Sequence, residues 1–298
     1  MKCPNCKTEL TLCEADAKPA TQIIPWMECN SPASFLDRWG WHRPDIEQPN
    51  PTPMYLEHCI DGLEYWQDVT DTAMVMTQPP YIDDVFPVIR EHTSMNIIGG
   101  VKVHSFVESA LNWQMVANSA ERIVKHTGIN KVILGCQTAL TPFHGGDTLI
   151  DFDVLMESLT PLRETGIEFI WYPVAILPDW DGVPDLESRT SELVDVIASK
   201  VPNSTFVTSY NAWHQDRRQE QREQMIELVG ADRTLDHLLT AVDGQWRYSD
   251  EPPRRIRTVQ ETITRIKAGF GDVRVCDVHP DPQSWVAVAR EFAEAWGR

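Results

Sequence analysis

Carboxylate side chains stand at or just beyond the ends of several short apolar runs, where they could act as acids and bases. Glu28 lies near the end of residues 21–29, Asp179 follows residues 169–177, and Asp277 lies near the end of residues 272–278. Two carboxyl groups that flank one bond can donate and accept a proton in turn. We therefore predict that Glu28 is the acid and that Asp277 or Asp179 is its partner.

Other polar and aromatic residues near the same strand ends could bind a substrate. Successive strand residues face opposite sides, so Lys102 and His104 share a face, as do Asp277 and His279. A buried charge must be paired or hydrogen-bonded, so we expect these pairs to point at one another or at a ligand. The full predicted binding set is Trp39, Trp41, Lys102, His104, Gln137, Trp180, Asp181, Tyr210, Asn211, Trp213, Asp243, Trp246 and His279.

The elements that must position these residues alternate along the chain. Residues 131–137 form an apolar, β-branched run, residues 151–163 have helical spacing, and residues 169–177 form a second apolar run. A strand, a helix and a strand make a βαβ unit, whose crossover makes the strands parallel. We predict further strands at residues 21–29, 72–78, 96–104, 204–213, 237–244 and 272–278. The other predicted helices lie near residues 54–67, 82–91, 110–126, 186–200, 215–228, 257–268 and 284–296.

Eight strand-then-helix units predict the α/β class and a (β/α)8 TIM barrel over residues 21–298, preceded by a short cysteine-containing extension at residues 1–20. In such barrels the chemistry lies at the carboxyl ends of the strands. An open doubly wound sheet is the alternative, but no glycine-rich dinucleotide turn follows the first strand.

Charge and hydropathy restrict the classes of molecule that this chain is expected to bind. The 298 residues carry a formal net charge of −18, which argues against nucleic acid or an anionic membrane as a partner. Every apolar run is shorter than the roughly 20 residues that span a bilayer, and the amino terminus lacks the apolar core of a signal peptide. We expect a soluble, cytoplasmic protein or a part of an assembly made in the cytoplasm, with no cofactor in the barrel.

Three cysteines near the amino terminus suggest a metal site. Cys3 and Cys6 form a CxxC turn and Cys13 follows, which gives three of the four ligands of a structural zinc knuckle. The fourth ligand is not identified, because Cys29 is separated from this turn by a strand. A free or redox-inert pair is the alternative. Seven cysteines in a chain of this length do not make a disulfide framework.

The carboxylates and loop tryptophans together resemble the pattern of TIM-barrel glycoside hydrolases. The resemblance covers residues 21–298 as architecture only, without a specific family motif. It implies hydrolysis of a carbohydrate between paired carboxylates, with aromatic faces holding the sugar rings. This chain departs from the large clan of these enzymes that places an Asn-Glu pair at the end of strand four. It has Cys136-Gln137 there, and a glutamine cannot donate a catalytic proton.

Two other functions stay open at this point. One is a metal-dependent hydrolase whose ligands come from His104, His144, His214 and His279 with Asp181 or Asp277. Barrel amidohydrolases carry a His-x-His pair at the end of strand one, where this chain has Met27-Glu28-Cys29. The other is a non-catalytic barrel that binds carbohydrate or has a structural role, as a homo-oligomer or in a larger assembly joined through the amino-terminal extension.

Overall fold

A computed structural model describes residues 23–29, 51–102, 113–135, 152–172, 186–207, 218–246, 254–267, 273–277 and 282–296 of the chain. Parallel strands make up its centre. They are β1 (Ile23–Cys29), β2 (Thr72–Thr77), β3 (Asn96–Lys102), β4 (Lys131–Gly135), β5 (Glu168–Tyr172), β6 (Ser204–Val207), β7 (Thr234–Ala241) and β11 (Val273–Asp277). Each lies within or close to a strand that the sequence predicts, which confirms the alternating βα organisation over the described residues.

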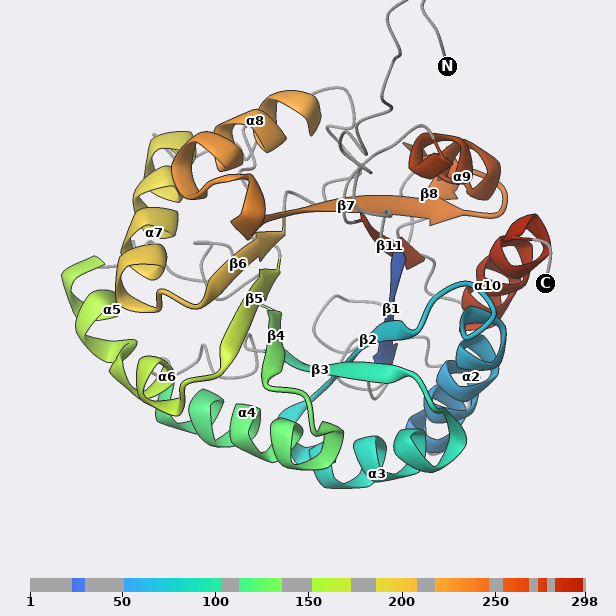
Figure 1. Ribbon diagram of the computed structural model, residues 1–298, viewed down its shortest axis with the longest axis horizontal. Helices are drawn as coiled ribbons and strands as arrows, with labels where there is room; N and C mark the ends of the chain where they lie inside the picture. The colour runs from blue at the N-terminus through green and yellow to red at the C-terminus, as the bar shows by residue number, and fades with distance from the viewer. Residues whose placement is uncertain are drawn as a thin grey trace, which may run out of the picture.

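Helices surround these strands, as Figure 1 shows in a view down the sheet axis. The helices are α2 (Pro51–Trp66), α3 (Ile82–His92), α4 (Trp113–Thr127), α5 (Phe152–Ser158), α6 (Thr160–Thr165), α7 (Leu186–Lys200), α8 (Arg218–Val229), α9 (Val259–Lys267) and α10 (Pro282–Trp296). Two short 3-10 helices, η1 (Pro79–Tyr81) and η4 (Ala231–Arg233), precede α3 and β7.

The strand order shows how the sheet curls. Parallel pairings run β7-β11-β1-β2-β3-β4-β5-β6, and β6 also pairs with β7. The β6–β7 contact is short, with Phe206 opposite Thr234 and Val207 opposite Leu235. The fold is therefore a TIM-like α/β fold, in which helices cover the outside of a curled parallel sheet. The carboxyl ends of the strands of this sheet all lie at the same end.

An insertion after β7 was not predicted. β8 (Gln245–Trp246) and β9 (Arg254–Arg255) form an antiparallel pair, and β10 (Arg257–Thr258) runs parallel to β7. Thr240 of β7 pairs with both Asp277 on β11 and Arg257 on β10. β10 thus takes the edge of β7 on which β6 pairs nearer the strand's start.

Two predicted boundaries are wrong for local reasons. The strand predicted at residues 237–244 ends at Ala241, because Gly244 has a φ of +66° and its N–H donates to the Ala241 carbonyl at 3.1 Å, which closes a turn. The single helix predicted at residues 151–163 is two helices, α5 and α6. Pro161 lacks the N–H that would continue the first helix, and the Thr160 hydroxyl donates to the Glu157 carbonyl instead, at 3.0 Å.

Alternation along the strands separates two buried apolar layers. The outer cluster joins strand residues such as Val75 and Val101 to helix residues such as Phe86, Ile123 and Phe292. The inner cluster is built from the opposite faces of the strands. It contains Ile24, Trp26, Met74, Met76, Ile98, Ile133, Ile170, Val207, Leu235, Ala241 and Ile256. Burying each large side chain contributes roughly 1.5–3 kcal/mol, so both layers hold the curled sheet together.

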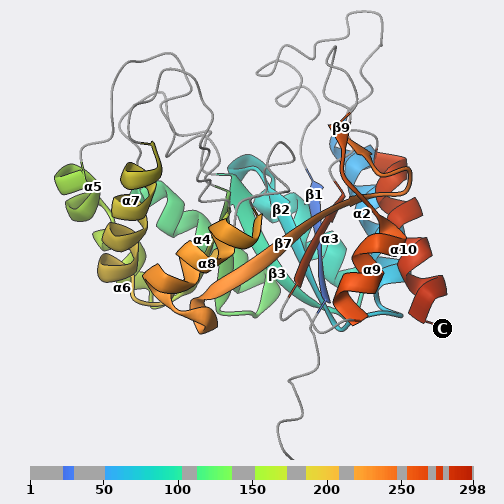
Figure 2. The same cartoon turned by 90° about the horizontal axis from the view of Figure 1, so that it is seen from above.

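The first and last described helices pack against each other and link distant parts of the chain. Trp66 of α2 and Phe292 of α10 have ring centroids 4.9 Å apart, and Trp296 lies 5.9 Å from Phe292. Figure 2 shows α2, α9 and α10 together on one side of the sheet and α5, α6 and α7 on the other. The strands β1 and β11, which these helices flank in the chain, pair with each other in the sheet, and Glu28 and Asp277 lie near their carboxyl ends.

Gly99 on β3 provides a test of the close packing between sheet and helices. A Cβ at this position would overlap Ile123 of α4 and lie 2.9 Å from the Phe86 ring of α3. We expect Gly99→Ala to lower the free energy of unfolding by about 1–3 kcal/mol, because overpacking forces these helices outward. Urea unfolding would measure it. Gly62→Ala in α2 is the control, since its Cβ would make only an ordinary contact with Met27 at 3.4 Å; equal stability of both variants would contradict the packing.

Asp83 in the first turn of α3 forms ion pairs with α4 whose contribution to stability depends on pH. It accepts hydrogen bonds from Arg122 at 2.5 Å and His126 at 2.7 Å, and these lower the pKa of Asp83 from 3.8 to about 2. Because the folded pKa is depressed, the stabilisation is complete above about pH 4 and is lost as the pH falls towards 2.

We therefore expect Asp83→Asn to be less stable than the wild type near neutral pH, by a margin that shrinks as the pH falls below about 4 and is lost below about pH 2. Thermal unfolding measured across this range would show the convergence. Asp84→Asn is the control, because Asp84 is an exposed neighbour on the same helix. A stability difference for Asp83→Asn that is independent of pH would contradict the role of its charge.

Candidate functional site

Three of the predicted site residues lie on strand ends at the carboxyl side of the sheet. Glu28 is the penultimate residue of β1, Lys102 ends β3, and Asp277 ends β11. Their backbones are in register with Met76, Gly135 and Thr240, respectively. The topology thus brings residues that are 74 or more positions apart to one end of the sheet, as the predicted fold requires.

The inner layer beneath this end is apolar and depends on a glycine. Gly100 on β3 lies between Met76 and Ile133, where an added Cβ would be 2.7 Å from the Met76 Cγ and 2.8 Å from the Ile133 Cβ. Only glycine lets these two side chains fill the interior at that level. A ligand at the carboxyl end would therefore rest on a packed apolar floor.

Asp243 and Trp246 lie beyond β7, not at its end. Asp243 is exposed in the turn that follows Ala241, and its Oδ1 accepts a hydrogen bond from the Gln245 N–H at 3.0 Å. This is the turn-forming role typical of aspartate. Trp246 is part of β8 and pairs with Arg254 of β9. Sequence reasoning placed Asp243 at the strand end because it extended β7 by three residues.

The other predicted site residues lie outside the described residues. They are Asp179 of the catalytic set, Trp39, Trp41, His104, Gln137, Trp180, Asp181, Tyr210, Asn211, Trp213 and His279 of the binding set, and Cys3, Cys6 and Cys13 of the zinc site. His144 and His214, which the metal-hydrolase hypothesis uses, also lie outside them. Within the described ranges, no group of three His, Cys, Asp or Glu is placed to hold a metal ion.

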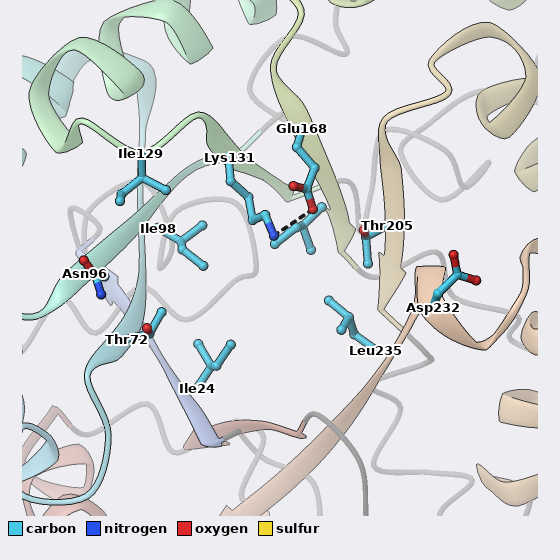
Figure 3. A pocket seen from close by; sticks show the side chains of 11 residues that line it. Ile24, Thr72, Asn96, Ile98, Ile129, Lys131, Glu168, Thr205, Asp232 and Leu235 are labelled. Carbon is cyan, nitrogen blue, oxygen red and sulfur yellow. Dashed lines mark ion pairs between the residues drawn. The ribbon is translucent and has the colours of Figure 1, made fainter. Parts of the chain in front are cut away.

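A pocket of about 310 Å³ opens at the opposite end of the sheet, where the strands begin (Figure 3). Its polar lining comes from residues at or near the amino ends of five strands and from η4. These residues are Thr72, Asn96, Lys131, Glu168, Thr205 and Asp232. The volume is at the lower end of the range found for small-molecule sites.

One ion pair lies on the rim of the pocket, between two adjacent strands. Lys131 and Glu168 begin β4 and β5 and are in register, and the Lys131 Nζ lies 2.7 Å from the Glu168 Oε1. Figure 3 shows the two side chains pointing at each other. The lysine is 33% exposed and the glutamate 39%, so water reaches both groups and each could exchange its partner for a ligand at little cost.

Asp232 gives the pocket an unbalanced negative charge. Its side chain is exposed and, within the described residues, makes no hydrogen bond or ion pair. The neighbouring Arg233 is held elsewhere: its Nε donates to the Ser204 carbonyl at 2.7 Å, and its guanidinium lies 5.8 Å from the Phe206 ring centre. Phe206 belongs to the outer cluster, so the arginine charge is on the helix side of the sheet.

The pocket floor is formed by inner-layer side chains. Ile24, Ile98, Ile170 and Leu235 are 0–7% exposed, and Ile129 packs against them at the rim. The sequence carried a signal for this pocket, because Thr72, Asn96, Lys131 and Glu168 are polar residues at the starts of buried strands. Sequence reasoning missed it by considering only the carboxyl ends.

No helix in the described part of the chain is long and apolar enough to cross a membrane.

Comparison with known proteins gives distant structural likenesses only. No protein-family model matches the chain, and no curated protein matches it. Among solved structures, active domain 2 of a chitinase from Pyrococcus furiosus is 12% identical, covers 94% of this chain and 97% of its own length, and has a TM-score of 0.48. A dihydropteroate synthase from Xanthomonas albilineans is 10% identical, with coverages of 93% and 92% and a TM-score of 0.43.

The orotidine 5'-phosphate decarboxylase from Pyrococcus horikoshii OT3 is 13% identical, covers 80% of this chain and 94% of its own length, and has a TM-score of 0.41. These likenesses are too distant to carry an argument about the activity of this chain. Its TIM-like fold rests on its own strand pairings.

Proposed function

We propose that the protein is a glycoside hydrolase-like (β/α)8 barrel that acts on a carbohydrate at the carboxyl ends of its strands. In this proposal the curled sheet is a complete barrel, and residues 1–20 are an extension that precedes it. The observation that carries the proposal is the position of Glu28. It lies at the carboxyl end of β1, between β11 and β2, where barrel enzymes place their reacting groups.

The register supports Glu28 as the acid. Position 28 continues the series of Ile24 and Trp26, which belong to the inner cluster, so alternation favours an inward carboxyl group at the end of β1. A general acid must hold its proton until it transfers it to the leaving group, so the proposal requires the Glu28 carboxyl group to be protonated when the substrate binds.

The register also separates the two candidate partners of Glu28. Asp277 is in register with Thr240, and Leu238, two positions earlier on β7, belongs to the outer cluster. Positions 28 and 277 therefore have opposite parity, which favours Asp179 over Asp277 as the second carboxylate. In either case the spacing of the pair sets the outcome: about 5 Å for retention and about 6.5–9.5 Å for inversion.

Lys102 and five tryptophans complete the proposed substrate site. Position 102 shares the parity of Ile98, which is in the inner cluster, and a lysine there can donate hydrogen bonds to sugar hydroxyls. The tryptophans at positions 39, 41, 180, 213 and 246 supply apolar ring faces of the kind on which sugar rings stack.

Replacement of the proposed acid tests this function. We expect Glu28→Gln and Asp179→Asn each to lower kcat/KM for a responsive substrate by about 10²–10⁴-fold, with KM nearly unchanged, because the proton transfer is lost while binding remains. The assay is release of reducing sugar from a panel of polysaccharides and of aryl glycosides in both anomeric forms.

Glu57→Gln on the exposed side of α2 is the matched control and should keep full activity. Asp277→Asn separates the two partners: a loss as large as that of Glu28→Gln would assign the role to Asp277. Unchanged hydrolysis in Glu28→Gln would contradict the catalytic assignment. Saturable glycan binding with no hydrolysis by the wild type would favour a non-catalytic barrel.

We also propose that Cys3, Cys6 and Cys13 hold a structural zinc ion with a fourth ligand still to be assigned. Three thiolates within eleven residues match the donors of closed zinc sites. The full chain should contain about one zinc per molecule by elemental analysis, and a Cys3→Ser, Cys6→Ser double variant should contain none. Equal zinc contents in the two proteins would refute the site.

A further inference from the structure

The pocket at the amino ends of the strands has features of a ligand site that the proposed catalytic function does not use. It lies at the opposite end of the sheet from Glu28 and Asp277, since Thr72, Lys131 and Glu168 begin the strands that line it. Barrel interiors are ordinarily closed by packed layers of side chains. Here a cavity of about 310 Å³ remains on the amino-end side of the inner layer.

We propose that this pocket binds a small organic cation, an amine with an apolar body. The floor of Ile24, Ile98 and Ile170 offers apolar surface, which a bare metal ion could not use and which an aliphatic or aromatic group would cover. The polar groups stand around this floor, so the ligand's charged end lies at the rim and its apolar part points inward.

The charges of the lining select a cation. Lys131 and Glu168 neutralise each other across the rim, and Asp232 adds a negative charge that no described group pairs with. The Arg233 guanidinium, the nearest opposing charge in sequence, is held on the outer side of the sheet by the Ser204 carbonyl and the Phe206 ring. The net charge of −18 on the chain attracts cations in general.

Hydrogen-bonding groups at the rim suit an ammonium ion. Thr205 and Asp232 lie on the same side of the pocket in Figure 3, and Glu168 lies between them and Lys131. Hydroxyl and carboxylate oxygens are acceptors for the three N–H groups of an ammonium. Asn96 stands across the pocket from Asp232 and could accept or donate a bond to a second polar group of the ligand.

Binding to the pocket can be measured through the methyl signals of its isoleucines. Methyl NMR of the full chain with labelled isoleucine would follow the signals of Ile24, Ile98, Ile129 and Ile170 during titration with benzylamine, which is protonated at pH 7. We expect saturable shifts of these four signals with one dissociation constant, roughly 0.1–10 mM for so small a ligand. The methyl groups of Ile89 and Ile123, buried in the outer cluster, should not move.

The charge requirement is tested with uncharged and anionic ligands, with two variants and with salt. Benzoate and neutral benzyl alcohol should bind at least about threefold more weakly than benzylamine, and Asp232→Asn should weaken benzylamine binding about three- to fivefold, as for an exposed ion pair. Asp84→Asn, an exposed carboxylate on α3, should leave it unchanged. Added salt should weaken the binding through screening.

The inference is overturned if the four pocket methyl signals do not saturate, if the outer-cluster methyls shift equally, or if benzoate binds as tightly as benzylamine. Unchanged affinity in Asp232→Asn would also overturn it. The outcome is independent of the proposed catalysis, because Glu28→Gln lies at the other end of the sheet and should bind benzylamine like the wild type.

Discussion

Backbone pairing between parallel strands is the constraint on which the rest of this structure depends. Each strand must satisfy its N–H and C=O groups on both edges, and the sequence of pairings from β7 through β11 and β1 to β6 ends with β6 pairing β7 again. The return contact involves only two residue pairs, and β10 takes over the same edge of β7 further along. Since the strands of this sheet are parallel, their amino ends gather at one end of the sheet and their carboxyl ends at the other. Both candidate sites follow from this.

The two ends differ in the chemistry that the fold gives them. At the carboxyl ends, Glu28, Lys102 and Asp277 come from strands that are distant in sequence but adjacent or nearly so in the sheet. At the amino ends, a satisfied ion pair, an aspartate with no partner among the described residues and an isoleucine floor surround a small cavity. Between them the inner layer is apolar and closely packed: a Cβ at Gly100 would lie 2.7 Å from the Met76 Cγ and 2.8 Å from the Ile133 Cβ. This layer lies between the two ends of the sheet, so a substitution at one end need not disturb the other.

Helix packing holds the strand register in place. The aromatic contact of Trp66 with Phe292 joins the first and last described helices, and the Asp83 ion pairs join α3 to α4 at the surface.

The α9 helix is fixed to the insertion after β7 by a reciprocal capping arrangement. The Thr258 hydroxyl accepts a hydrogen bond from the Glu261 N–H at 3.2 Å, and the Glu261 carboxylate accepts one from the Thr258 N–H at 2.9 Å. The hydrogen bond from the Thr258 N–H, followed by the hydrogen bond from Arg255, lowers the pKa of Glu261. Thr258 also pairs with β7, so the cap ties helix, insertion and sheet together.

Local sequence determined the alternation of buried strands and amphipathic helices, because hydrophobic period and β-branched content report directly on whether a segment is buried on one face or two. The α7 helix and the starts of β2, β3, β4 and β6 fall where the sequence placed them. Tertiary structure alone decided the rest. β10 pairs with the carboxyl-terminal end of β7, and parity in the register sets Glu28 apart from Asp277. The amino-end pocket is of the same kind: its polar residues are scattered singly along the chain, and only the curling of the sheet brings their charges into one cavity.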